Sequence, residues 1–152
     1  MPPSYVTIWM TSLADVVWVS VGADPPGHFT LAGHVIVEDH AVIGGLAAIH
    51  QFCRIGKMAI IGGCSKVVRD VPPFMLTDGN PAQTRTINKV GLERNQVSPE
   101  AQTALKQAYR LLFREGLTNP NALARIEAEL PSLPEIQYLV QFVRSSQRGI
   151  SK

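Results

Sequence analysis

The chain has few of the features that mark several common protein classes. It contains only 2 cysteines in 152 residues, Cys53 and Cys64, and their spacing matches no zinc or redox motif. We therefore expect both thiols to be reduced and structural, which favours a cytoplasmic protein. The net charge is only +2, and no clustered basic face is visible. Nucleic-acid binding is therefore not expected.

Long apolar segments are also missing. No stretch approaches the roughly 18 apolar residues of a membrane helix, so we expect no stable membrane insertion. The first 22 residues carry a single charge, Asp15, as a signal peptide might, but they lack Lys and Arg. Pro2, Pro3 and Asp15 also interrupt their apolar character. The sequence is thus typical of a soluble protein.

A six-residue repeat occupies residues 31–72. Every one of its hexads opens with an aliphatic residue and has a small or β-branched residue at the fifth place. A period of six fits neither an α-helix nor a half-buried strand. It predicts a left-handed parallel β-helix, a solenoid with three flat faces per coil and the first and fifth places inside. Glycines at second places (44, 56 and 62) are expected to relieve the backbone where each face bends. The first places are Leu31, Val37, Ile43, Ile49, Ile55, Ile61 and Val67, and the fifth places are Val35, Ala41, Ala47, Cys53, Ala59, Ser65 and Val71.

The repeat divides the chain into four regions. Residues 1–30 are interpreted as an aberrant or degenerate segment, with a weak hexad register from residue 13. The β-helix is expected over 31–73, where prolines end it, and the turn-rich residues 74–97 are expected to form a linker loop. Residues 98–152 predict a small helical domain, because Ser98 can cap a helix with Pro99 at its first position and two further amphipathic segments follow.

Four motifs carry a resemblance to a known family: AGHV (32–35), HQFC (50–53), GGCSKVVRDVPP (62–73) and INKVGLER (87–94). Together with the helical tail, they resemble the C-terminal half of the acyl-carrier-protein:UDP-N-acetylglucosamine O-acyltransferases, which start lipid A biosynthesis. The resemblance implies a homotrimer with active sites between subunits. It also implies transfer of a 3-hydroxyacyl chain from acyl carrier protein to the 3-hydroxyl of UDP-N-acetylglucosamine, with no cofactor and no metal.

The same resemblance implies roles for individual residues. Gly33 would supply the backbone amide that stabilises the oxyanion. Glycine at position 63 would leave the acyl pocket deep, which suits a long hydroxyacyl chain. Two replacements near the UDP contacts, Val90 for a Glu and Asn95 for a basic residue, depart from the family pattern. The implied substrate-binding residues are His34, His50, Gln51, Gly63, Asn88 and Arg94.

The largest departure concerns the catalytic base. An ungapped comparison puts Asp15 where the family has its general-base histidine and Val16 where the supporting Asp belongs. Aspartate has an ordinary pKa of about 3.9 and is a poor base at neutral pH without strong desolvation. The catalytic residue is therefore unknown, and we expect the chain to be inactive. We hypothesise that residues 1–30 are damaged or wrongly translated, because the resemblance begins abruptly near Leu31.

Three alternatives stay open. The chain could be an inactive trimeric remnant that binds acyl carrier protein or a UDP-sugar without turnover. It could also acylate another amino sugar, since positions 90 and 95 affect nucleotide recognition. A β-helical zinc carbonic anhydrase needs three histidines at other spacings than those of His34, His40 and His50, so it is disfavoured. Trimer formation has a physical reason as well, because an open solenoid has bare edges and flat faces that need covering.

Overall fold

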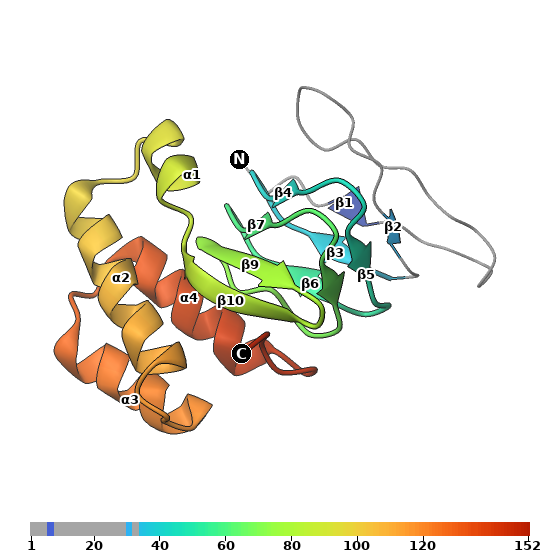
Figure 1. The fold of residues 1–152 in the computed structure, drawn as a ribbon. Helices are drawn as coiled ribbons and strands as arrows, with labels where there is room; N and C mark the ends of the chain where they lie inside the picture. The colour runs from blue at the N-terminus through green and yellow to red at the C-terminus, as the bar shows by residue number, and fades with distance from the viewer. Residues whose placement is uncertain (1–5, 8–29, 32–33) are drawn as a thin grey trace.

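The computed structural model describes residues 6–7, 30–31 and 34–152, which form a coil of short strands, a hairpin and a group of helices (Figure 1). Two positions of interest, Asp15 and Gly33, lie outside the described residues, as does the hexad register expected from residue 13. Among the helices of the described part, none is long and apolar enough to cross a membrane.

The coil consists of one two-residue strand per hexad. These strands are β2 (Thr30–Leu31), β3 (Ile36–Val37), β4 (Val42–Ile43), β5 (Ala48–Ile49), β6 (Arg54–Ile55), β7 (Ile60–Ile61) and β8 (Lys66–Val67). Strands eighteen positions apart pair in parallel, as in the register Ile36↔Arg54. This pairing produces three sheets, which contain β2-β5-β8, β3-β6 and β4-β7. A short strand β1 (Val6–Thr7) pairs antiparallel with β3. The predicted three-sided parallel solenoid is therefore present.

The interior of the coil follows the hexad places. Every described fifth-place residue is buried, from Val35 to Val71, and Ser65 is 1% exposed although it is polar. The first-place residues from Val37 to Val67 are buried as well, except Ile43, which is partly buried. Inward placement of both positions is thus confirmed. Since each turn of the solenoid buries its residues against the next turn, the coil is stabilised between neighbouring coils.

Except in the last hexad, the coil bends after each strand at a fourth-place residue that is left-handed and is not glycine. From His34 to Cys64 these fourth-place residues have φ values near +60°, for example His40 at 58° and Leu46 at 61°. Backbone bonds such as Ala47 N to Gly44 O, at 3.3 Å, close turns of the type II kind. The second-place glycines have no positive φ, so the expected backbone relief is wrong for them. They are needed for space, because a Cβ on Gly44 would lie 2.5 Å from Gly63 N in the next coil.

Residues 74–97 are not the expected linker loop. They form β9 (Met75–Gly79), β10 (Ala82–Ile87) and the short helix α1 (Lys89–Arg94). Strand β9 pairs in parallel with β7 and antiparallel with β10, so the hairpin widens one sheet of the coil. Burial alternates along both strands, with Met75 and Thr77 buried on β9 and Ala82 and Thr84 buried on β10.

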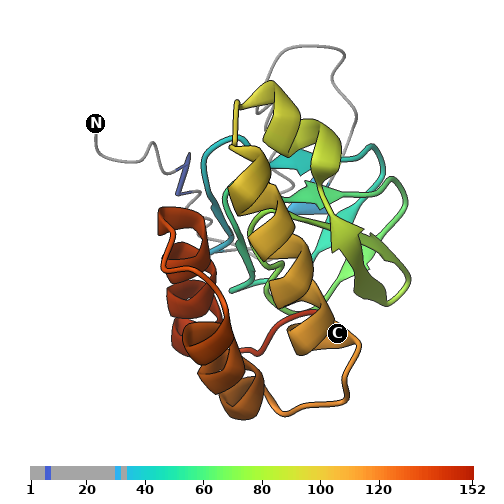
Figure 2. The same cartoon turned by 90° about the vertical axis from the view of Figure 1, so that its left-hand side faces the viewer.

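Three amphipathic helices complete the chain, as predicted: α2 (Pro99–Phe113), α3 (Asn119–Glu129) and α4 (Pro134–Ser145). Ser98 caps α2 by accepting a hydrogen bond from Ala101 N at 3.2 Å. The helices group on one side of the coil in both views (Figures 1 and 2). Their apolar faces form a second buried cluster, which includes Leu105, Ile126 and Leu139.

A polar network joins α4 to the coil. Glu38 is only 3% exposed, and its Oε1 accepts from Arg54 Nε at 2.6 Å. Arg54 also donates through Nη1 to Ser145 Oγ at 3.1 Å. The buried Asp70 accepts from Arg54 N at 2.9 Å and from Ser146 Oγ at 2.6 Å. Because buried charges must be paired, this network fixes the position of α4 against the β3-β6 sheet.

Candidate functional site

Four residues gather at one edge of the coil and are named here the His34 corner: His34, His50, Gln51 and Phe52. His34 and Phe52 occupy fourth places one full coil apart, with φ values of 59° and 64°. Their rings stack with centroids 5.2 Å apart and planes inclined by 19°. Both side chains are exposed. The ring directly next to His34 is that of Phe52, a residue to which the family resemblance assigned no role.

The hydrogen bond of His50 fixes which of its ring nitrogens carries a proton. Its Nδ1 lies 3.0 Å from the backbone oxygen of Gln51. Since a carbonyl oxygen only accepts, Nδ1 is the donor in this bond. In the neutral ring Nε2 then carries the lone pair and can accept a proton or a hydrogen bond from a ligand. The imidazole of His50 is thus oriented as a general base or a hydrogen-bond acceptor would need to be.

Gly63 lies at a different corner of the coil, next to Cys64. It lies in the turn that follows β7, and the residue one coil before is Gly45, in the turn that follows β4. A Cβ on Gly63 would lie 3.2 Å from Gly45 O, so a larger side chain would be tight but not excluded. Within one chain, the structure therefore does not bring Gly63 to the His34 corner.

The INKVGLER motif forms α1 and its cap, and Asn88 has an internal role there. Its Nδ2 donates to Met58 O at 2.9 Å, and its Oδ1 accepts from Gly91 N at 3.1 Å. Asn88 is 6% exposed and ties α1 to the coil. Asn95 is similarly engaged, since its Nδ2 donates to Gly91 O at 2.8 Å. Arg94, by contrast, is exposed in the last turn of α1 and can reach a ligand.

The two thiols have different environments. Cys53 is fully buried at a fifth place, and Cys64 is exposed. Burial raises the pKa of the Cys53 thiol from 9.0 to about 11, and Arg148 only partly opposes that effect. Cys53 is therefore a neutral packing residue at physiological pH. Among the described residues, no group of three or more His, Cys, Asp or Glu side chains could hold a metal ion.

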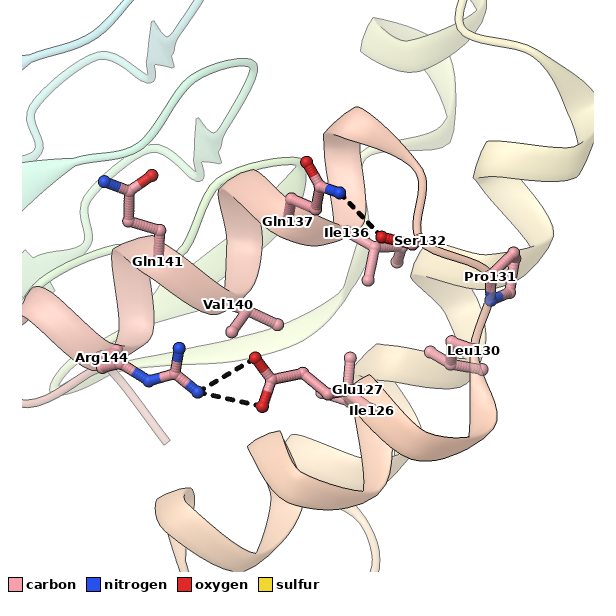
Figure 3. A pocket seen from close by; sticks show the side chains of 10 residues that line it. All are labelled: Ile126, Glu127, Leu130, Pro131, Ser132, Ile136, Gln137, Val140, Gln141 and Arg144. Carbon is pink, nitrogen blue, oxygen red and sulfur yellow. Dashed lines mark hydrogen bonds and ion pairs between the residues drawn. The ribbon is translucent and has the colours of Figure 1, made fainter.

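A pocket of about 530 Å³ lies between α3 and α4 and is separate from the residues discussed so far. Figure 3 shows its apolar floor, with Ile126 and Val140 facing each other, and its polar rim. The rim carries the ion pair of Arg144 with Glu127 at 3.0 Å. Sequence reasoning did not find this pocket, because its lining comes from the ordinary amphipathic pattern of two helices.

The fold and the His34 corner define the class: a three-sided parallel β-solenoid of hexapeptide repeats with a helical extension. Within that class, the chain belongs to the UDP-N-acetylglucosamine O-acyltransferase family. The model of this family described as "Udp N-acetylglucosamine O-acyltransferase; Domain 2" matches residues 70–151, more than half of the chain.

Individual relatives agree with this assignment. The acyl-[acyl-carrier-protein]–UDP-N-acetylglucosamine O-acyltransferase of Anaeromyxobacter dehalogenans is 40% identical over 88% of this chain and 52% of the relative. The Myxococcus xanthus protein of the same name is 46% identical over 78% of this chain and 46% of the relative. The structure of LpxA from Acinetobacter baumannii aligns with a TM-score of 0.77 at 41% identity, covering 80% of this chain and 48% of that one. The chain thus spans about half the length of these relatives.

Proposed function

We propose that this chain serves the transfer of a 3-hydroxyacyl group from acyl carrier protein to the 3-hydroxyl of UDP-N-acetylglucosamine, the first step of lipid A biosynthesis. The observation that carries the proposal is the His34 corner, which presents two imidazoles and an amide side chain within a chain 40% to 46% identical to enzymes named for this reaction. Polar groups clustered on a rigid coil can orient a sugar nucleotide without rearrangement.

The reaction needs two groups from the protein, a base and a hydrogen-bond donor for the oxyanion. A base removes the proton of the sugar hydroxyl, whose oxygen then attacks the thioester carbon of the acyl chain. A donor stabilises the negative charge on the former carbonyl oxygen, and we assign this to the amide of Gly33. The carbon–sulfur bond then breaks, and the carrier leaves as a thiolate that takes up the proton held by the base. The new oxygen–carbon bond is an ester, so no cofactor or metal is needed to balance the step.

We assign the substrate contacts to two parts of the molecule. His34, His50 and Gln51 bind the sugar nucleotide and the reacting end of the acyl chain. Arg94 binds phosphate, because a guanidinium donates two parallel hydrogen bonds to phosphate oxygens. Asn88 contributes by holding α1 in place, given its bonds to Met58 and Gly91. Gly63 admits a long hydroxyacyl chain.

The proposed assembly is a cytoplasmic homotrimer of left-handed coils. We propose a trimer because Gly63 and the His34 corner lie at different corners of one chain. Residues of two chains are therefore needed to complete one site. Exposed apolar side chains on the coil also need covering by another copy. These are Ile36, Val42, Leu46 and Phe52. Residues 31–73 would form the coil of each subunit and residues 98–152 its helical domain.

A second candidate function is binding of the UDP-sugar or the acyl carrier protein without turnover. It is favoured by Asp15, which stands at the position where the family resemblance places the histidine base. In this case the His34 corner would still bind ligand, and only proton removal would fail.

An acyl-transfer assay separates the two candidates. The purified chain is mixed with 3-hydroxyacyl-carrier protein and UDP-N-acetylglucosamine, and acylated sugar nucleotide is quantified. Turnover that survives Asp15→Ala and is lost in His50→Ala supports the first candidate and identifies His50 as the base. Binding of UDP-N-acetylglucosamine without turnover supports the second. Absence of both turnover and binding contradicts both.

A further inference from the structure

Among the described residues of the coil, the stacked pair at the His34 corner has no equivalent at the other two corners. One coil after His40 the fourth place holds Met58, and one coil after Leu46 it holds Cys64. At the His34 corner two aromatic rings lie above one another, 5.2 Å apart and nearly parallel. That separation lies within the range of favourable aromatic pairs.

Phe52 is unusual in being aromatic and 56% exposed. Packing inside the chain does not require a ring at this place, since Leu46 occupies the equivalent turn position with a φ of 61° and is 71% exposed. Among the described residues, the ring of Phe52 contacts the ring of His34. The structural reason for an aromatic ring at position 52 is therefore its contact with the imidazole of His34.

We infer that Phe52 is a positioning residue for His34. The turn fixes the backbone of both residues, and the stack then restricts rotation of the imidazole about its side-chain bonds. Stacking engages the face of the ring, whereas the two nitrogens lie at its edge, where an imidazole makes its polar contacts. A pre-oriented ring loses less conformational freedom when the ligand binds. This inference rests on the proposed function, because it assumes that His34 contacts the sugar nucleotide.

Three variants test the inference. Phe52→Leu removes the ring but keeps apolar bulk that this turn tolerates, Phe52→Tyr keeps the ring, and Leu46→Ala removes a comparable exposed apolar side chain from another corner. Two quantities are measured for each: the nuclear magnetic resonance signals of the His34 ring C–H groups, assigned with His34→Gln, and the affinity for UDP-N-acetylglucosamine. The oligomeric state is recorded in parallel by sedimentation.

We expect the His34 signals to move in Phe52→Leu, because the ring current of Phe52 is lost, while those of His40 stay in place. The affinity for UDP-N-acetylglucosamine should fall about two- to tenfold, as loss of one aromatic pair implies. Phe52→Tyr should restore both quantities. Leu46→Ala should leave the His34 signals unchanged, which separates the stack from any change in subunit association.

Unchanged His34 signals in Phe52→Leu would overturn the inference, as would a failure of Phe52→Tyr to restore binding. If the wild-type chain does not bind UDP-N-acetylglucosamine, the proposed function fails. The His34 signals then still report on the stack, so the two failures are distinguishable.

Discussion

The coil and the helical domain are two cores built in different ways. In the coil, a narrow stack of aliphatic and small side chains fills the interior, and each residue meets its equivalent one coil away. In the helical domain, the apolar faces of three helices meet in a separate cluster. The coil therefore depends on a strict place in a repeat, whereas the helical domain depends on which faces happen to be opposed.

This difference determines how each region should respond to substitution. A change inside the coil cannot relax easily, because the backbones of adjacent coils are in direct contact and fix the available volume. A helix can shift or tilt slightly to fill space. We therefore expect neighbouring positions in the coil to differ sharply in their tolerance, and positions in the helical domain to differ less.

The largest effect is expected for Ile61→Ala. Ile61 is 1% exposed in the coil interior, whereas Ile60, on the same strand, points outward and is only partly buried. Ile61→Ala should lower the free energy of unfolding by about 3 to 4 kcal/mol through lost burial and a cavity. Ile60→Ala should cost less than about 1.5 kcal/mol. Urea denaturation measures both, and similar losses would contradict the inward and outward assignment of the hexad places.

The next largest loss of stability is expected for a glycine that contacts the backbone of the adjacent coil. An added Cβ at Gly44 would meet the backbone of the next coil at 2.5 Å, while at Gly63 the nearest atom is 3.2 Å away. Gly44→Ala should destabilise the chain by about 2 kcal/mol through overpacking. Gly63→Ala is the matched control and should cost less than about 1 kcal/mol. If thermal unfolding shows the reverse order, close approach of the coils is not the reason for Gly44.

A smaller effect is expected in the helical domain from Ser98→Ala. This change removes the side chain that accepts from Ala101 N at the start of α2. The free energy of unfolding should fall by about 1 kcal/mol. Ser98→Asp keeps an acceptor at the cap and should retain most of the stability, as measured by circular dichroism during thermal unfolding. Equal destabilisation by both changes would show that the cap contributes little.

The smallest effect on stability at neutral pH concerns Cys53. Its pKa is raised to about 11 by burial, so the fold favours the neutral thiol. This contribution is complete below pH 9 and is lost as the pH rises through about 11. The urea midpoint of the wild type should therefore decline more steeply over that range than the midpoint of Cys53→Ala. If the urea midpoints of the wild type and Cys53→Ala decline in parallel, the neutral thiol of Cys53 does not contribute to this pH dependence.

The two cysteines should also differ in reactivity, because one is buried in the coil and the other is exposed. At pH 8 a thiol reagent should modify Cys64, which is exposed, and leave Cys53 unmodified in the native chain. Cys64→Ser should abolish the rapid reaction, and denaturant should restore reaction at Cys53. Rapid modification of Cys53 in the native chain would show that the coil opens readily.

The coil could be predicted from the sequence because its code is local and periodic. A residue such as Ala59 or Val67 reveals its inward position by its place in the hexad alone. The hairpin of β9 and β10 was missed because its two strands follow prolines and surround a turn-rich segment, which together suggested a loop. The arrangement of α2, α3 and α4 could not be predicted, since amphipathic helices do not specify their partners.

In the candidate site, too, contacts between residues far apart in the sequence could not be predicted. The motifs pointed to His34 and His50, but the stack of His34 on Phe52 depends on a pairing eighteen positions apart that becomes visible only when the coil closes. The internal bonds of Asn88 were also hidden, because an Asn at the start of a short helix can equally cap it or bind a ligand. Arg94 is exposed, and the phosphate contact that the resemblance implied for it stays a prediction.

The most direct test of the account is calorimetric titration of the purified chain with UDP-N-acetylglucosamine. The account predicts saturable binding that weakens by about tenfold in Arg94→Ala, from loss of a charge-assisted contact. It predicts no change in Arg110→Ala, an equally charged and exposed residue on α2. Absence of saturable binding by the wild-type chain, or an equal loss in both variants, would contradict it.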